Sequence, residues 1–139
     1  MTTIEIPIPP SANHLWRVVH KNRHSKCGKR KIVVRTKQYR SFLKQVVPLI
    51  RIGISVQTAP VRVTITIRGG KGWSYKRDIG NCEKATLDAL VHAKRIPDDS
   101  CSNVVHEELI YLRPLPGQRA RCWLSIQEVN PNDYMGEPD

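Results

Sequence analysis

Carboxylates stand at both ends of one predicted helix, and their chemistry suits the binding of a divalent cation. Asp78 is the first acidic residue after an acid-free stretch from residue 6 to residue 77, and Asp98 and Asp99 follow the helix. Magnesium prefers carboxylate and water oxygens and typically takes one or two protein carboxylates. Hydrolysis of a phosphodiester uses such a cation to polarise the phosphoryl oxygen and to generate hydroxide. A metal-dependent reaction of phosphate esters is therefore one hypothesis for these residues.

Two polar residues inside the helix could take part in the same chemistry. Asn81 and Lys84 lie three positions apart and share a helix face, and the ammonium group of Lys84 could stabilise developing negative charge. A simpler interpretation is also open. Asp78 is typical of an N-cap, which accepts hydrogen bonds from free backbone N–H groups. Acids beside bases also form ordinary surface ion pairs.

The distribution of charge indicates a polyanionic partner. The chain has 139 residues, a net charge of +11 and an isoelectric point near 9.9. Residues 1–77 hold 17 of the 23 Lys and Arg residues but one of the 12 acids, and so much unpaired charge repels itself unless a polyanion covers it. Nucleic acid is therefore favoured over a merely soluble basic protein. The residues expected to bind nucleic acid are Arg17, Lys21, Arg23, Lys26, Lys29, Arg30, Lys31, Lys76 and Arg77.

The order of predicted elements indicates one α+β domain over residues 1–129 and a loose tail over 130–139. We expect a mixed β-sheet of about four strands with two main helices. Alternation predicts an edge strand over 3–8, a strand over 61–67, and a closing hairpin of strands over 103–112 and 120–129. Helical periodicity predicts helices over 37–52 and 79–93. Between these elements we expect a loop or hairpin over 17–31 with a short strand over 32–36, and a glycine-rich loop over 68–75. Pro48 should kink or shorten the last turn of the first helix.

Several other classes of protein are disfavoured. No apolar run approaches the roughly 18 residues of a membrane span, and the N-terminus lacks the basic and apolar regions of a signal peptide. We therefore expect a cytoplasmic protein with no membrane partner and with free thiols at its four cysteines. His20, His24 and Cys27 have the spacing of part of a zinc site, but no clear fourth ligand is near. Polar residues of a basic loop are the favoured interpretation.

The segments "RDIGNCEKATLDAL", "PDDS" and, near the N-terminus, "PPSANHLW" resemble the RusA family of Holliday-junction resolvases, which is common in prophages. The resemblance extends from about residue 5 to residue 128 and implies a RusA-like fold. It implies a hydrolase: a homodimeric, magnesium-dependent endodeoxyribonuclease that resolves four-way DNA junctions in recombination and repair. DNA would be the partner, Mg²⁺ the cofactor, and no small-molecule cofactor would be needed.

The same resemblance assigns roles to individual residues. Asp78, Lys84 and Asp99 match the catalytic residues of the family. Asp78 and Asp99 would be metal ligands, and Asp98 is the neighbour that could substitute for Asp99. The asparagines that match the motifs are Asn13 and Asn81.

One position departs from the family pattern. Gly80 stands where the family usually has a second aspartate, and Glu83 and Asp88 are the candidates for supplying the missing carboxylate. A DNA-binding protein that kept the fold and lost the chemistry is therefore the alternative to a nuclease. An RNA-binding module is a third and weaker interpretation, because the stacking aromatics are sparse, with three Trp, four Tyr and one Phe.

Overall fold

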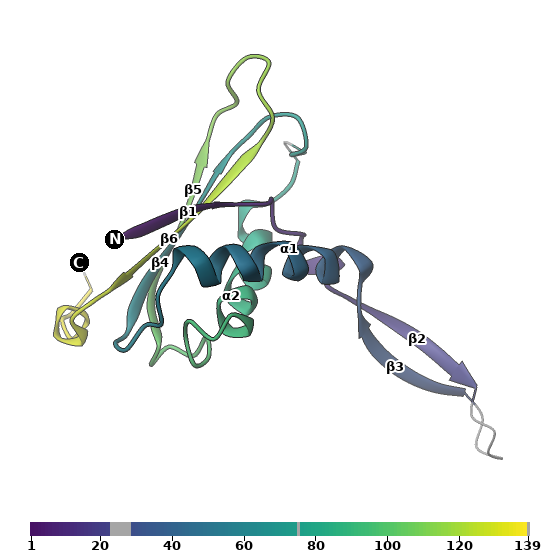
Figure 1. The fold of residues 1–139 in the computed structure, drawn as a ribbon, viewed down its shortest axis with the longest axis horizontal. Coiled ribbons are helices and arrows are strands. Elements are labelled where there is room, and N and C mark those ends of the chain that lie inside the picture. The colour runs from purple at the N-terminus through teal and green to yellow at the C-terminus, as the bar shows by residue number, and fades with distance from the viewer. Residues whose placement is uncertain (23–28, 75, 139) are drawn as a thin grey trace.

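Four strands form a mixed sheet in the order β1-β6-β4-β5, and β2 and β3 form a separate two-stranded sheet (Figure 1). The computed structural model describes residues 1–22, 29–74 and 76–138. The elements are β1 (Thr2–Ile6), η1 (Ala12–His14), β2 (Trp16–Asn22), β3 (Lys29–Arg35), α1 (Lys37–Gly53), β4 (Val61–Arg68), η2 (Ile79–Cys82), α2 (Glu83–His92), β5 (Val104–Leu112), β6 (Arg121–Glu128) and η3 (Pro131–Tyr134), the η elements being 3₁₀ turns. This arrangement confirms the predicted α+β class and the four-stranded mixed sheet.

Strand β4 lies at the centre of the sheet. Every second residue of β4 is buried, as its alternation predicts. It pairs parallel with β5 on one side and antiparallel with β6 on the other. The predicted hairpin of residues 103–112 with 120–129 is therefore wrong, because β4 lies between these strands. A parallel partner needs a long crossover, and the segment that holds η2 and α2 supplies it.

Helix α1 covers one face of the sheet through an apolar stripe. The hydroxyl of Thr36 accepts a 3.2 Å hydrogen bond from the backbone N–H of Tyr39 and so caps the helix. The helix continues past Pro48 to Gly53, so the expectation that Pro48 would shorten it is wrong. Pro48 is exposed, and the carbonyl that its ring leaves without an N–H partner lies four residues earlier, on the solvent side at exposed Lys44.

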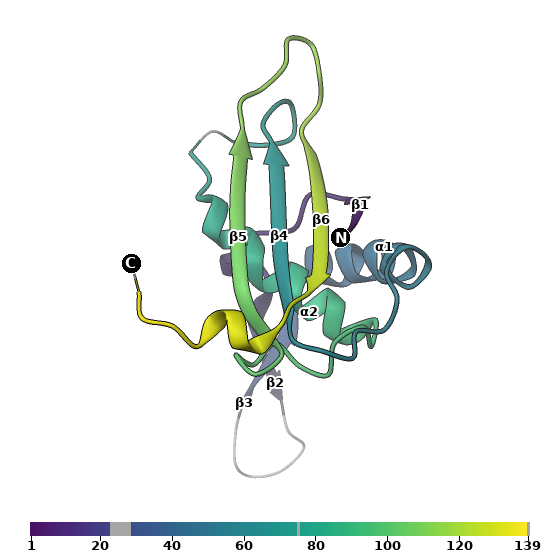
Figure 2. The same cartoon turned by 90° about the vertical axis from the view of Figure 1, so that its left-hand side faces the viewer.

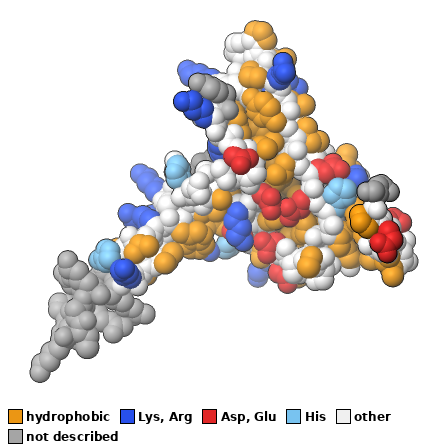
Figure 3. All heavy atoms as spheres, turned by 180° about the vertical axis from the view of Figure 1, so that it is seen from behind, with side chains coloured by type: hydrophobic (Ala, Val, Ile, Leu, Met, Phe, Trp, Pro, Cys, Tyr) orange, Lys and Arg blue, Asp and Glu red, His pale blue; other side chains and the backbone are white. Residues whose placement is uncertain are grey.

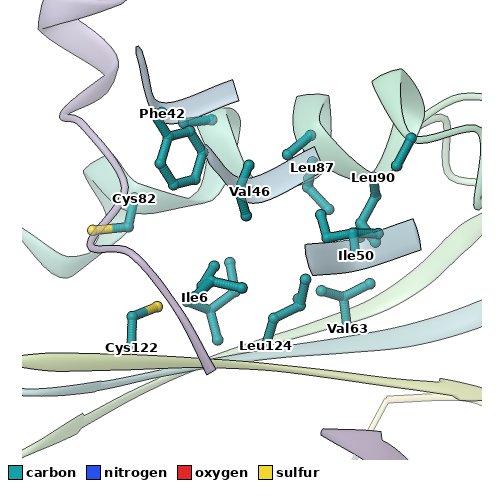
Figure 4. Close-up of a cluster of buried hydrophobic side chains, with 14 of the residues drawn as sticks. Ile6, Phe42, Val46, Ile50, Val63, Cys82, Leu87, Leu90, Cys122 and Leu124 are labelled. Atoms are coloured by element: carbon teal, nitrogen blue, oxygen red, sulfur yellow. The ribbon is translucent and has the colours of Figure 1, made fainter. Parts of the chain in front are cut away.

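The core lies between the two helices and the sheet (Figure 4). Val46 and Ile50 of α1, Leu90 of α2 and Leu124 of β6 have no exposed surface. Figure 2 shows the sheet from its other side, with β5, β4 and β6 in front and both helices behind them. Because Leu87 and Leu90 of α2 are buried in this core, α2 and the residues at its start are anchored to the sheet.

Strands β2 and β3 form a hairpin that extends away from the sheet (Figure 1). This outcome confirms the hairpin among the alternatives predicted over 17–31. Its strands contain the expected DNA-binding residues Arg17, Lys21, Lys29, Arg30 and Lys31. Four residues of the sequence predictions lie in segment 23–28, outside the described residues: Arg23, His24, Lys26 and Cys27.

The C-terminal segment after β6 contains the short turn η3. The hydroxyl of Tyr134 in this turn lies 3.0 Å from Nδ1 of His106 in β5. The division into a domain over 1–129 and a tail over 130–139 stays a prediction. No helix in the described part of the chain combines the length and apolar character that crossing a membrane requires.

Candidate active site

Asp78 caps the segment that leads into α2. Its Oδ1 accepts a 3.0 Å hydrogen bond from the backbone N–H of Gly80, which confirms the simpler interpretation of Asp78 as a cap. The predicted helix over 79–93 begins with the 3₁₀ turn η2, and regular α-helix runs from Glu83 to His92. The cap occupies one oxygen of the exposed Asp78 carboxylate and leaves the other one available to solvent.

Lys84 lies between two carboxylates on the exposed side of α2. Its Nζ is 2.9 Å from Asp88 Oδ1, one turn further along the helix, and 3.3 Å from Asp99 Oδ2 in the loop that follows. The hydrogen bond to Asp88 is the largest of the effects that raise the pKa of Lys84. The ammonium group therefore stays charged near neutral pH. Two of the predicted catalytic residues, Lys84 and Asp99, are thus brought together.

A pair of glutamates beside Asp99 is a feature that the sequence predictions missed in part. Glu107 of β5 is in register with the buried Val63 of β4, so its side chain is on the helix-covered side of the sheet. Its carboxyl group lies near those of Glu83 and Asp99. Desolvation first, and then Glu83 and Asp99, raise the pKa of the Glu107 carboxyl to about 7. No local pattern of the sequence marks Glu107, because the face that it occupies follows from its register with Val63 in β4.

The other predicted site residues occupy different surroundings. Asp98 faces its own loop, where its Oδ1 accepts hydrogen bonds from the Ser100 backbone at 2.9 Å and from Asn103 at 2.7 Å. Asn81 lies in η2, and its backbone N–H donates to the Asp78 carbonyl at 3.2 Å. Asn13 lies in η1, where its backbone N–H contacts the hydroxyl of Ser11 at 3.4 Å. Neither asparagine side chain has a hydrogen bond within the described part of the protein.

Position 80 faces Asp78. A β-carbon built on Gly80 would lie 3.4 Å from Asp78 Oδ1, and among the described residues its only other neighbour within 4 Å is Cγ of the same residue. A side chain at position 80 therefore has room, and a carboxylate there would adjoin Asp78. Because glycine has no side chain, this side of the site has one carboxylate fewer than the family pattern predicts.

Basic groups flank the acids along the chain and on the surface. Lys76 is exposed, whereas the guanidinium of Arg77 lies 4.5 Å from the centre of the Trp73 ring and donates to the carbonyl of Pro9. Figure 3 shows acidic side chains gathered on one face, with Lys and Arg side chains beside them and towards the hairpin. A surface of this kind attracts phosphate around a small acidic centre.

Comparison with known families identifies the family to which the chain belongs. The family described as Endodeoxyribonuclease RusA matches residues 7–126, which is most of the chain. The chain belongs to the RusA family. This finding confirms the family resemblance, and the RusA family supports DNA as the partner and phosphodiester cleavage as the type of reaction. No curated protein matches the chain.

RusA-family resolvases generally depend on a divalent metal ion, and the donor chemistry of this chain fits a hard cation. Asp78, Asp99, Glu83 and Glu107 all offer carboxylate oxygens, which such cations prefer. Among residues 1–22, 29–74 and 76–138, no three His, Cys, Asp or Glu side chains are placed to hold a metal ion together. One or two carboxylates completed by water are the arrangement that magnesium commonly takes, so the residues present are sufficient for this ion.

Proposed function

We propose that the chain is an endodeoxyribonuclease that resolves four-way DNA junctions in recombination and repair, with Mg²⁺ as its cofactor. The contact between Lys84 and Asp99 at 3.3 Å is the observation that carries this proposal. The two motif residues come from α2 and from the loop beyond its end, and they meet close to Glu107. A cation held among carboxylates beside a basic surface suits attack on a polyanionic backbone.

The proposed metal ligands are Asp78 and Asp99, with water completing the coordination that lacks a carboxylate at Gly80. Bound there, Mg²⁺ would polarise the phosphoryl oxygen and lower the pKa of a bound water. Asp98 is the second choice, because its Oδ1 already accepts two hydrogen bonds within its loop. Asn81 and Asn13 keep their proposed places as motif residues near the site.

The proposed role of Lys84 is electrostatic. Its contacts with Asp88 and Asp99 hold the ammonium in one place, so little reorganisation is needed when negative charge develops on the phosphoryl oxygens. The basic residues of the hairpin, together with Lys76 and Arg77, would position the DNA by contacts to its phosphates. Such contacts fix the register of the duplex without reading its sequence.

We also propose that the protein acts as a homodimer. A four-way junction has two-fold symmetry, and two symmetric nicks need two sites, one in each subunit. Sedimentation of the protein, free and bound to a junction, tests this statement. A monomer in both states would contradict it.

The decisive experiment uses a four-way junction labelled on each strand in turn. Paired nicks on opposite strands in the presence of Mg²⁺, and none with EDTA, are the expected result. Lys84→Gln serves as the matched variant, since it keeps a long polar side chain and removes the charge. We expect this variant to bind the junction and to fail in nicking it. A linear duplex of the same sequence should be cut much more slowly.

A binding protein without catalysis is the second candidate, and Gly80 is the observation that favours it. If the chain binds junctions tightly but produces no nicks at any Mg²⁺ concentration, this candidate replaces the nuclease. Nicking by the unsubstituted protein excludes it.

A further inference from the structure

A cleft of about 530 Å³ lies beside the first turns of α1. The proline-rich segment 7–10 forms one wall, α1 forms another, and Gly72 and Arg77 of the loop after β4 close it. Its volume is within the roughly 300–1,000 Å³ of small-ligand pockets. Arg77 is the residue directly before Asp78, so the cleft adjoins the candidate active site along the chain.

The wall formed by α1 is polar and regularly spaced. Gln38, Ser41 and Gln45 follow one another at steps of three and four, so they form a single stripe along the helix. All three are exposed to solvent. Nε2 of Gln45 donates a 3.1 Å hydrogen bond to the Ser41 hydroxyl, which leaves its carbonyl oxygen and its second N–H hydrogen available. An amide side chain offers both donors and an acceptor, as the edges of nucleobases do.

The opposite wall of the cleft is apolar. Pro7, Ile8, Pro9 and Pro10 line it, and the ring of Phe42 lies at its base. Phe42 is almost completely buried by the core beneath. Flat apolar surfaces of this kind suit the faces of a planar ring, whose burial removes apolar area from water.

The charges around the cleft are positive. Lys37 and Arg77 line it, and no acidic residue does so within the described part of the chain. Nε of Arg77 is buried without a hydrogen-bond partner among the described groups, while stacking on Trp73 and the bond to Pro9 fix the guanidinium. The first turn of α1 also contains no acidic side chain, so no acid of that turn neutralises the positive end of the helix dipole. The cleft therefore favours a planar ligand that carries a phosphate.

We propose that this cleft holds one nucleotide of the DNA strand next to the one cut, and that the amides of Gln38 and Gln45 read its base. The proposal rests on the proposed function, because it supplies that nuclease with a sequence preference. Lys37 and Arg77 would receive the phosphate, by contacts that are the same for every base. The base would lie against the prolines, with its hydrogen-bonding edge towards α1.

The test measures binding alone, so it does not depend on cleavage. Four single-base DNA tetranucleotides, d(A)₄, d(C)₄, d(G)₄ and d(T)₄, are titrated against the protein in EDTA by fluorescence anisotropy. We expect the four affinities to differ by at least about fivefold, the lower end of what a bidentate base contact gives. In the double variant Gln38→Ala and Gln45→Ala the affinities should agree within about twofold, since the base contacts are gone.

Two further variants separate base reading from general attraction. Lys37→Gln should weaken binding of all four tetranucleotides by the same factor, since it contacts phosphate. Gln118→Ala, an exposed glutamine in the loop between β5 and β6, should change nothing. Equal affinities in the unsubstituted protein, undetectable binding, or a preference that survives the double substitution would each overturn the proposal. A base preference without any junction cleavage would instead reject the proposed nuclease and keep the cleft.

Discussion

The hydroxyl group of Tyr39 donates a 2.7 Å hydrogen bond to Asp88 Oδ2, and this bond ties α1 to the candidate active site. The other oxygen of Asp88 contacts Lys84 at 2.9 Å. Tyr39 therefore fixes Asp88, and Asp88 fixes the ammonium group. Desolvation, followed by the bond to Asp88, raises the pKa of the Tyr39 hydroxyl well above its usual value, so Tyr39 remains a donor at any physiological pH.

Replacing Tyr39 by phenylalanine removes this bond and keeps the ring. We expect the free energy of unfolding to fall by about 0.5–1.5 kcal/mol, and junction nicking to fall by roughly tenfold because Lys84 loses its fixed position. Urea denaturation and nicking rates measure the two effects. Tyr134→Phe is the matched control, since it removes a tyrosine contact to His106 in the C-terminal turn. Equal nicking by both variants would contradict the positioning role of Tyr39.

Asp99→Asn and Asp98→Asn separate two adjacent acids with different surroundings. Asp99→Asn removes charge beside Lys84 without adding bulk, so nicking should be lost while junction binding stays the same or tightens. Asp98→Asn keeps the loop oxygen that bonds Ser100 and Asn103 and should retain most of the nicking. If the two results are reversed, Asp98 is the metal ligand and the assignment of Asp99 is wrong.

Gly80→Asp restores the carboxylate that the RusA pattern has at this position. Because a β-carbon here would meet only Asp78, the substitution is sterically tolerated, but two carboxylates repel each other without a cation. We expect a lower Tm in EDTA and a larger increase of Tm with Mg²⁺ than in the unsubstituted protein. Faster nicking at low Mg²⁺ should accompany this. Gly80→Asn, which fills the same space without charge, should show none of these changes.

The raised pKa of Glu107 makes stability depend on pH. The folded protein keeps this proton up to about pH 7, whereas the unfolded chain loses it near the usual value of 4.5. The contribution of Glu107 to stability is therefore lost as the pH rises from about 4.5 to about 7. Glu107→Gln should flatten this part of the curve of unfolding free energy against pH, measured in EDTA. Glu137→Gln, an exposed residue of the C-terminal segment, should leave the slope unchanged.

The hairpin prediction concerns the salt dependence of DNA binding. Arg17 and Lys31 are exposed on β2 and β3, and each phosphate contact contributes about 0.9 to the slope of log affinity against log salt. Replacing both by glutamine should reduce the slope by up to about 1.8. Arg51→Gln, at the far end of α1 from the hairpin, is the control (Figure 1). An unchanged slope would place the DNA elsewhere.

The sequence was sufficient wherever a local pattern decides the structure. The alternation of residues 61–67 predicts β4, the stripe of residues 37–52 predicts α1, and Asp78 is read correctly as a cap. The order of strands was not predictable in this way. Strands 103–112 and 120–129 look like a hairpin, but β4 lies between them, and the alternation within a strand does not indicate which strands pair with it.

The site residues that are close in sequence were predicted, whereas those that the fold brings together from distant segments were not. Lys84 and Asp99 could be proposed from a motif, since they are close in sequence. Glu107 could not, because its direction depends on its register with Val63 in β4. The cleft beside α1 was missed for the same reason, as its walls come from three distant segments.

The central place of β4 also determines when the sheet can be completed during synthesis. Both of its partners, β5 and β6, come later in the chain. While a ribosome is still making residues 69–120, β4 has no partner on its β6 side, and its unpaired edge can meet another chain. The sheet closes only when Arg121–Glu128 has emerged. The nascent protein is therefore unable to hold Glu107 near α2 on a finished sheet until its last strand is in place.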